Sequence, residues 1–202
     1  MRMLLTALVV ATTLPSVAEE RHQSALFAPA VVFQLMSAPG FEVRNPERAF
    51  GTQKAVDLFR RTMRRLTEQF KALPDVCVGD LSVKGGGRLR PHRSHRDGRD
   101  IDIGFYFKDG RERRWFERAT PRTLDAPRTW ALIKALVDSG EVEYVFLQLR
   151  LQKPVYDYAR KTGTPKAVLD RIFQYPQGRR SKRGIVRHER GHDDHLHIRF
   201  KR

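Results

Sequence analysis

The chain has 202 residues, of which 40% are hydrophobic and 31% charged, and these values exclude a largely disordered protein. The length fits one domain with a sizeable core. The formal net charge of +16 favours an anionic partner, although such an excess can also be a solvated face. Because Cys77 is the single cysteine, no internal disulfide can form, and its valine neighbours indicate a small buried hydrophobe.

The first residues follow the pattern of a secretory signal peptide. Arg2 precedes a short apolar run, and Ser16-Val17-Ala18 has the small residues of a cleavage site. The run is too short to span a bilayer comfortably, so a retained membrane anchor is the weaker alternative. We expect a signal peptide over residues 1–18, a single domain over residues 19–202, and a periplasmic or secreted protein. Cell-wall polymers, acidic lipids and carboxylate-rich peptides are then more plausible polyanionic partners than nucleic acid.

Helices and strands alternate imperfectly along the remaining chain. Thr52 is a suitable N-cap for a helix that ends before Pro74. One face of this helix is apolar, and the other faces carry arginines that either lie in solvent or bind a partner. Three consecutive glycines, Gly85 to Gly87, require a turn. The expected elements are helices over residues 53–73, 126–139 and about 153–161, a loop over 174–183, and strands over 76–83, 100–107, 143–149 and 195–200. This order predicts an α+β fold rather than a doubly wound parallel sheet.

Five of the seven histidines lie in two short stretches, residues 92–102 and 191–197. Clustered imidazoles and carboxylates are costly to bury without a partner, and a divalent metal ion supplies one. The stretches contain His and Asp but no Cys, which favours a catalytic zinc over a structural zinc.

Strand periodicity sorts these side chains. Residues i and i+2 of a strand share a face, so His195 and His197 project together, and Asp100 and Asp102 repeat the arrangement. If the two strands are neighbours, both polar faces line one cleft, with His95 in the loop just before. A catalytic zinc takes three protein ligands, and we expect His95, Asp102 and His197 to hold one zinc ion per chain.

The neighbouring polar residues have expected roles around that metal. Water bound to the metal has a lowered pKa, and His195 is placed to take a proton from that water. His192 is placed to form a hydrogen bond with the oxyanion or with the leaving group. Asp100 either orients a ligand histidine or makes a local loop hydrogen bond. Ser94 lacks a surrounding G-x-S-x-G sequence and is interpreted as a loop hydrogen-bonder rather than a nucleophile. Asp194 is a turn-former, a partner of the ligands, or both.

Two motifs carry a family resemblance. Ser94-His95-x-x-Gly98-x-x-x-Asp102, followed much later by His195-x-His197, resembles the metallopeptidases grouped with lysostaphin, the D-Ala-D-Ala carboxypeptidases and the hedgehog signalling domain. Within that group, Pro91-His92-x-Ser94-His95 and the segment from Gly191 to Arg199 are most similar to the penicillin-insensitive murein endopeptidases. The resemblance implies a small central antiparallel sheet with flanking helices. It also implies that His95, Asp102 and His197 bind the zinc and that His195 is the base. In that family His192 assists, and His92 belongs to the active-site histidines.

The implied reaction is hydrolysis of the D-alanyl–diaminopimelyl amide that crosslinks peptidoglycan stems. Water is the nucleophile, so β-lactams should not inhibit it. Peptidoglycan carboxylates would pair with basic residues that flank the expected site: Arg93, Arg96, Arg99 and Arg199. A zinc DD-carboxypeptidase can share this metal centre, and a non-catalytic zinc domain that binds the cell wall is a further alternative, against which the presence of His195 argues. A secreted metal-dependent nuclease would need a motif that the sequence lacks.

Overall fold

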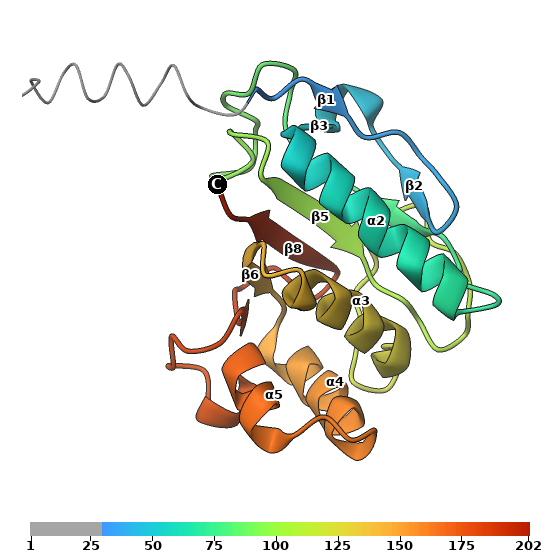
Figure 1. The fold of residues 1–202 in the computed structure, drawn as a ribbon, viewed down its shortest axis with the longest axis vertical. Helices are drawn as coiled ribbons and strands as arrows, with labels where there is room; N and C mark the ends of the chain where they lie inside the picture. Colours follow the sequence, from blue (N-terminus) through green and yellow to red (C-terminus); the bar gives the residue numbers. More distant parts are fainter. Residues whose placement is uncertain (1–29) are drawn as a thin grey trace, which may run out of the picture.

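A six-stranded sheet in the order β2-β4-β5-β8-β6-β7 forms the centre of the molecule (Figure 1). The computed structural model describes residues 30–202, so the expected signal peptide lies outside the described residues. The strands are β2 (Phe41–Val43), β4 (Val76–Val78), β5 (Asp100–Gly104), β6 (Val142–Phe146), β7 (Val186–Arg187) and β8 (His195–Phe200). The inner strands pair antiparallel, whereas β2 and β7 join the edges in parallel. Two short strands, β1 (Phe33–Gln34) and β3 (Phe50–Gly51), form a separate pair.

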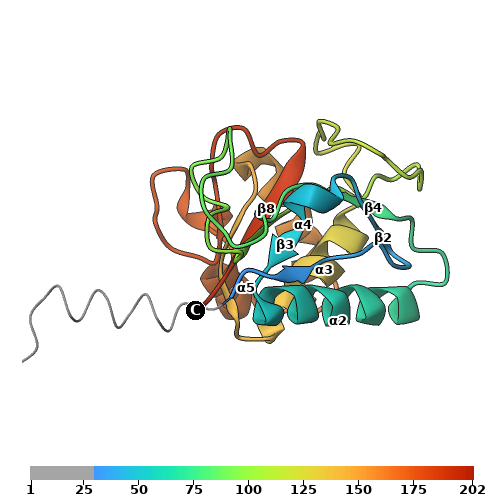
Figure 2. The ribbon, with the colours of Figure 1, turned by 90° about the horizontal axis from the view of Figure 1, so that it is seen from above.

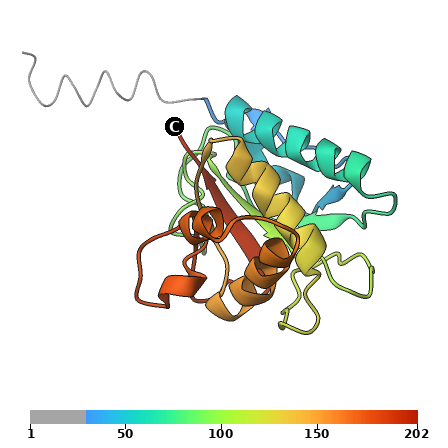
Figure 3. The ribbon, with the colours of Figure 1, turned by 60° about the horizontal axis from the view of Figure 1, so that its bottom comes forward.

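Helices α2 (Gln53–Gln69) and α3 (Ala126–Asp138) lie along one face of this sheet (Figure 2). Thr52 caps α2 by accepting a hydrogen bond from the Ala55 N–H, and the apolar stripe of the helix is buried in the core. Helices α4 (Leu149–Lys161) and α5 (Lys166–Ile172) pack together beyond α3 (Figure 3). Two short 3-10 helices, η1 (Pro46–Arg48) and η2 (Tyr175–Gln177), complete the elements.

The two faces of the sheet differ in chemistry. Alternate residues of β5 and β8, such as Ile101 and Ile198, are buried in the apolar core. The residues between them project to the opposite face, and the register pairs Asp102 with His197 and Gly104 with His195. Loops over residues 85–99 and 188–194 cover this second face (Figure 2). The expected juxtaposition of the two polar strand faces is therefore confirmed.

The α+β fold and its antiparallel centre are confirmed, but several boundaries differ. Helix α2 ends at Gln69 because Phe70 adopts an extended backbone. β4 ends at Val78, since Asp80 turns toward the polar face instead of continuing the strand. α4 begins at Leu149, four residues earlier than expected, and includes Pro154 within the helix. Elements that the sequence did not predict are β1, β2, β3, α5, β7 and the two 3-10 helices.

None of the helices within residues 30–202 is both long enough and apolar enough to cross a membrane.

Candidate active site

Three buried polar side chains converge on the loop-covered face of the sheet. His197 Nδ1 lies 2.9 Å from Asp102 Oδ1 and 3.1 Å from His95 Nε2, and the last two atoms are 3.4 Å apart. β5 and β8 supply Asp102 and His197 as cross-strand partners, and the loop before β5 supplies His95. Each side chain is almost fully buried. The three residues that the sequence singled out as ligands thus direct one donor atom each toward a common point.

His95 reaches this point through an unusual backbone conformation. Its φ angle is 56°, in the left-handed region, and its N–H donates to Asp100 Oδ2 across 2.9 Å. Gly98, with φ 65°, turns the chain between these two residues. His95 Nδ1 lies 2.8 Å from the Leu81 carbonyl oxygen, which can only accept a hydrogen bond. Nδ1 therefore carries the proton, and the Nε2 lone pair faces the cluster.

A carboxylate fixes the orientation of the His197 ring. His197 Nε2 donates to Asp100 Oδ1 across 3.1 Å, which turns Nδ1 toward the cluster. Arg199 Nη1 donates to both oxygens of Asp100, at 2.8 and 2.6 Å. Burial raises the pKa of Asp100, but the His197 hydrogen bond and the charges of His197 and Arg199 outweigh burial and lower it. Asp100 therefore contacts both the His197 ring and the His95 loop, the two hydrogen-bonding arrangements that the sequence left open.

This donor set fits a zinc ion. The ligand atoms of a tetrahedral zinc with bonds of about 2.0–2.1 Å lie roughly 3.3 Å apart, close to the separations in the cluster. Burial lowers the pKa of His197, yet hydrogen bonds to Asp100 and Asp102 raise it to about 9. The pKa of Asp102 lies well below its usual range, because the hydrogen bond from His197 and the neighbouring imidazoles outweigh its burial. The cluster thus favours a positive charge among its three donor atoms.

His195 lies beside the cluster and is held by its neighbour in the chain. Its Nδ1 donates to Asp194 Oδ1 across 2.6 Å, and its Nε2 lies 3.7 Å from Asp102 Oδ1. The hydrogen bond from His195 is the largest of the effects that lower the pKa of Asp194. A ring that carries its proton on Nδ1 has a free Nε2 lone pair, the form required of a proton acceptor.

An aromatic ring stacks on His195. The Phe116 ring lies 4.7 Å from the imidazole, centroid to centroid, at an angle of 17° between the planes. The guanidinium of Arg44 contacts the same phenyl ring at 4.9 Å from its centroid. The loop that carries Phe116 is joined to the histidine segment by a 2.8 Å hydrogen bond from the Ala119 N–H to the Asp193 carbonyl. Phe116 therefore limits the positions that the His195 ring can adopt.

His192 lies close to the other histidines of the site. Its ring centroid is 4.9 Å from that of His195, and its Nδ1 donates to the Arg190 carbonyl across 3.1 Å. Burial, with the nearby charge of His195, lowers the pKa of His192 to about 4. The ring is therefore neutral at neutral pH, and in this tautomer its Nε2 accepts hydrogen bonds. Donation to an oxyanion would require the proton on Nε2 and the loss of the bond to Arg190.

His92 borders the cluster on the other side. Its Nε2 lies 2.7 Å from Asp80 Oδ2, and its Nδ1 lies 3.9 Å from Asp102 Oδ2. His92, His95 and Asp102 form a second set of possible ligand atoms, all within 4.8 Å of one another. The separations of 2.9 to 3.4 Å belong to the set that contains His197, so that set is the tighter one.

A cavity of about 560 Å³ opens over these residues. Tyr144 and Phe146 form an aromatic wall, and the Phe146 ring stacks on His197 with centroids 5.4 Å apart. Arg93 and Ser94 lie at the cavity as well; within residues 30–202 the Ser94 hydroxyl has no hydrogen bond of its own. Asp102 and His197 line this cavity, so the cluster is open to it from the loop side, whereas His95 lies behind them.

The four arginines expected to meet substrate carboxylates are not equivalent. Arg199 is engaged with Asp100, and Arg99 is buried and pairs with Asp97 at 2.8 Å. Arg96 is exposed outside the cavity lining, whereas Arg93 lines the cavity. Arg99 and Arg199 thus stabilise the fold around the cluster, and Arg93 is the one of the four whose side chain is available at the cavity.

Residues 36–202 match the family described as penicillin-insensitive murein endopeptidase. The chain belongs to this family. The match includes both histidine stretches and all the described strands except β1, so the resemblance carried by the two motifs is confirmed. None of the curated proteins matches the chain. The family implies a peptidase that acts on peptidoglycan.

Some residues of the candidate site were not predicted from the sequence. They lie on three segments outside the two histidine stretches: Asp80 after β4, Phe116 in a loop, and Tyr144 and Phe146 on β6. Asp80 follows a buried strand, and an acidic residue at such a strand end is a signal that sequence reading can use. The three aromatic residues have no motif spacing, and only the fold brings them to the histidines.

Proposed function

We propose that this chain is a zinc-dependent murein DD-endopeptidase that hydrolyses the D-alanyl–diaminopimelyl amide crosslink of peptidoglycan. The observation that carries the proposal is the convergence of His95 Nε2, Asp102 Oδ1 and His197 Nδ1, with separations of 2.9 to 3.4 Å, beside a fourth side chain, His195. The family match supports the substrate class, and the donor set supports zinc.

His95, Asp102 and His197 would hold one zinc ion per chain. When bound, zinc supplies a Lewis acid that lowers the pKa of water and polarises a substrate carbonyl. The protein fixes the two histidine ligands through their other ring nitrogens, with the Leu81 carbonyl on one side and Asp100 on the other. Such outer partners set the tautomer and direction of a ligand ring before any metal arrives.

His195 is the proposed general base and, later, the general acid. Asp194 accepts the Nδ1 proton, so the Nε2 lone pair can take a proton from the attacking water. The water oxygen bonds to the D-alanyl carbonyl carbon, the C–N bond breaks, and His195 returns the proton to the departing amine. One water molecule is thereby divided between a new carboxyl group and a new amino group. Phe116 keeps the ring in line by stacking on it.

His192 is proposed to assist through a hydrogen bond near the reacting amide. Its depressed pKa keeps the ring neutral, so it adds no repulsive charge next to the metal ligands. The proposed reaction occurs where peptidoglycan lies, and the sequence pattern over residues 1–18 agrees with a periplasmic or secreted protein. Nucleic acid is not a proposed partner.

The proposal is tested with crosslinked muropeptide dimers and purified protein loaded with zinc. Mass spectrometry of the products should show conversion of dimer to monomer, loss of conversion on chelation and recovery when zinc is restored. His195→Ala should lower kcat by about 10²–10⁴-fold while the protein still binds one zinc, because the ligands are intact. A β-lactam should not inhibit the wild-type protein.

Other results would favour the alternatives. Release of terminal D-alanine from uncrosslinked pentapeptides, with dimers left intact, would identify a DD-carboxypeptidase instead. One equivalent of zinc with no cleavage of any wall peptide would contradict the proposal and favour a binding domain.

A further inference from the structure

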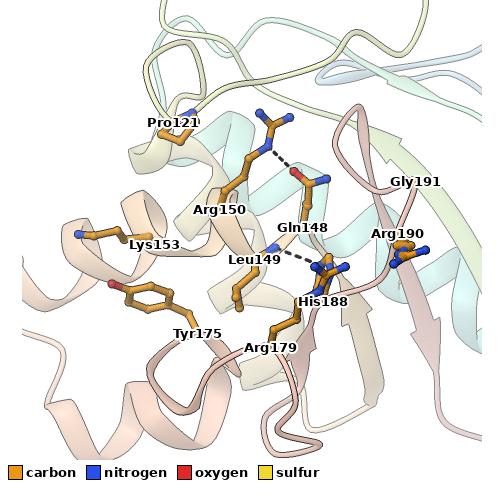
Figure 4. Close-up of a pocket in the computed structure, with 10 residues that line it drawn as sticks. All are labelled: Pro121, Gln148, Leu149, Arg150, Lys153, Tyr175, Arg179, His188, Arg190 and Gly191. Carbon is orange, nitrogen blue, oxygen red and sulfur yellow. Dashed lines mark hydrogen bonds between the residues drawn. The ribbon is translucent and has the colours of Figure 1, made fainter.

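A second cavity lies directly behind the wall of the active-site cavity. Figure 4 shows the residues that line it. Its volume is also about 560 Å³. The segment before β8 separates the two spaces: His188, Arg190 and Gly191 line the second cavity, whereas Glu189 and His192 line the active-site cavity. The two cavities therefore lie on either side of a single stretch of chain, residues 188–192.

The second cavity, here called the basic pocket, is lined by four basic side chains, of which only two are paired with an acid. Arg150, Lys153, Arg179 and Arg190 line it, and no Asp or Glu is among its lining residues. Two of these cations are engaged: Arg150 pairs with Asp193, and Lys153 pairs with Asp157. Within residues 30–202 the guanidinium groups of Arg179 and Arg190 form no ion pair, although the Arg190 backbone N–H donates to Glu189 Oε1 across 3.1 Å. Free guanidinium groups beside a cavity are suited to carboxylates, which they bind with two parallel hydrogen bonds.

The remaining walls provide apolar surface and a further donor. Leu149 and Tyr175 line the pocket beside the cations (Figure 4). His188 Nδ1 accepts a hydrogen bond of 3.3 Å from the Leu149 N–H, so its ring proton lies on Nε2, where it can be donated. A pocket with apolar walls and a few convergent polar donors is typical of a ligand site.

The basic pocket is also joined to the catalytic segment by hydrogen bonds. The Gln148 N–H donates to the His192 carbonyl across 2.9 Å, and Arg150 Nη2 donates to Asp193 Oδ2 across 3.1 Å. Both donors belong to residues that line the pocket. A ligand in the basic pocket therefore contacts the residues that hold the His192 segment in place.

We propose that the basic pocket binds a carboxylate group of the stem peptide whose crosslink lies in the active-site cavity, with Arg179 and Arg190 as its main partners. The inference rests on the proposed function, because crosslinked stem peptides carry free carboxylates beyond the bond that is cut. Binding that is remote from the reacting atoms acts alike on the ground state and the transition state, so it lowers KM and leaves kcat nearly unchanged.

The test uses the zinc-loaded protein and the double variant R179E/R190E. With crosslinked dimers, KM should rise about 10-fold or more, because the loss of one charge-assisted hydrogen bond lowers affinity by about that factor. The value of kcat should stay within about twofold of the wild-type value. The matched control is R60E/R64E, which makes the same charge change at exposed positions of α2 on the opposite face of the sheet. Its KM should remain close to the wild-type value. Equal KM increases in the two variants would show a general charge effect and would overturn the proposal.

A binding measurement separates this inference from the proposed function. Calorimetry with uncrosslinked muropeptide monomers, free or amidated at their carboxyl groups, does not depend on cleavage. Wild-type protein should bind the free acids about 10-fold more tightly than the amidated peptides, and R179E/R190E should lose this preference. Equal affinity for both peptides would overturn the carboxylate assignment even in a protein that cleaves dimers. Absence of cleavage with the preference intact would instead contradict the proposed function alone.

Discussion

His197 donates a hydrogen bond from Nε2 to Asp100 across 3.1 Å, and this contact directs Nδ1, the other ring nitrogen, toward His95 and Asp102. Asp100 is itself fixed by Arg199 at 2.6 Å and by the backbone N–H of His95. One buried carboxylate therefore connects both proposed histidine ligands, from two strands and one loop. The sequence separation of 97 residues between His197 and Asp100 shows that this arrangement depends on the folded sheet.

Asp100→Asn should weaken zinc binding by about 10–100-fold, the usual effect of removing a carboxylate that orients a ligand histidine. The amide keeps the shape of the side chain but lacks the charge that Arg199 and the His197 ring require. Competition with a coloured chelator measures the affinity. Asp194→Asn is the matched control: it should lower the rate of dimer cleavage and leave zinc affinity near the wild-type value. Equal zinc affinities in Asp100→Asn and wild type would show that the contact has no orienting role.

Phe116→Ala should reduce kcat about 10-fold or more with unchanged zinc content, because a proton acceptor displaced by about 1 Å loses much of its effect. The ring that it removes stacks on His195 at 4.7 Å. Trp115→Ala, at the exposed neighbouring position, should have a much smaller effect on kcat. Steady-state kinetics on muropeptide dimers measures both. A similar loss of kcat in the two variants would assign the effect to the loop as a whole.

The charge state of His192 predicts how stability depends on pH. Its pKa is about 4 in the folded protein, whereas a histidine in an unfolded chain has a pKa of about 6.5. The unfolded state therefore binds the proton more tightly than the folded state does. The stabilisation that comes from the neutral His192 ring is complete above about pH 6.5 and decreases as the pH falls toward 4. Denaturant unfolding of wild type and His192→Gln at several pH values isolates this group. The stability difference should change between pH 6.5 and 4 and be constant above that range; a difference that is constant throughout would contradict the burial of the ring.

Gly98→Ala should lower the free energy of unfolding by about 2–3 kcal/mol, since the site combines backbone strain with a close approach. Its φ is 65°, and an added Cβ would lie 2.7 Å from a Val31 methyl and 2.9 Å from the Thr52 nitrogen. Gly85→Ala is the control in the same loop, with φ 81° and nothing within 4 Å of an added Cβ. Its loss should be about 1 kcal/mol, from the left-handed conformation alone. If urea unfolding gave equal losses of unfolding free energy for Gly98→Ala and Gly85→Ala, the close contact at Gly98 would be relieved by small shifts of its neighbours.

The parts of the site that lie on strands could be predicted because strand periodicity is strict. His195 and His197 share one face of β8 as expected, and the pairing of β5 with β8 places Asp102 opposite His197. Gly98, a glycine of the quoted motif, turns the loop before β5 with a positive φ. These features depend on local geometry and on a single assumption about strand pairing.

The rest of the site depends on contacts between segments that no local pattern connects. Phe116 lies in a loop without regular structure, and its contact with His195 follows from how that loop folds over β4 and β5. Strands β1, β3 and β7 have two residues each, too few for a periodic pattern. The basic pocket likewise combines residues from α4, η2 and the segment before β8, which only the tertiary structure brings together.

The most direct test of the account is a crystal structure of the zinc-loaded protein, with the metal located by anomalous scattering at the zinc edge. We predict one zinc bonded to His95 Nε2, Asp102 Oδ1 and His197 Nδ1, with the Asp100 carboxylate still hydrogen-bonded to the His197 ring. A zinc bonded to His92 together with His95 and Asp102, while His197 remains unbonded, would contradict the account.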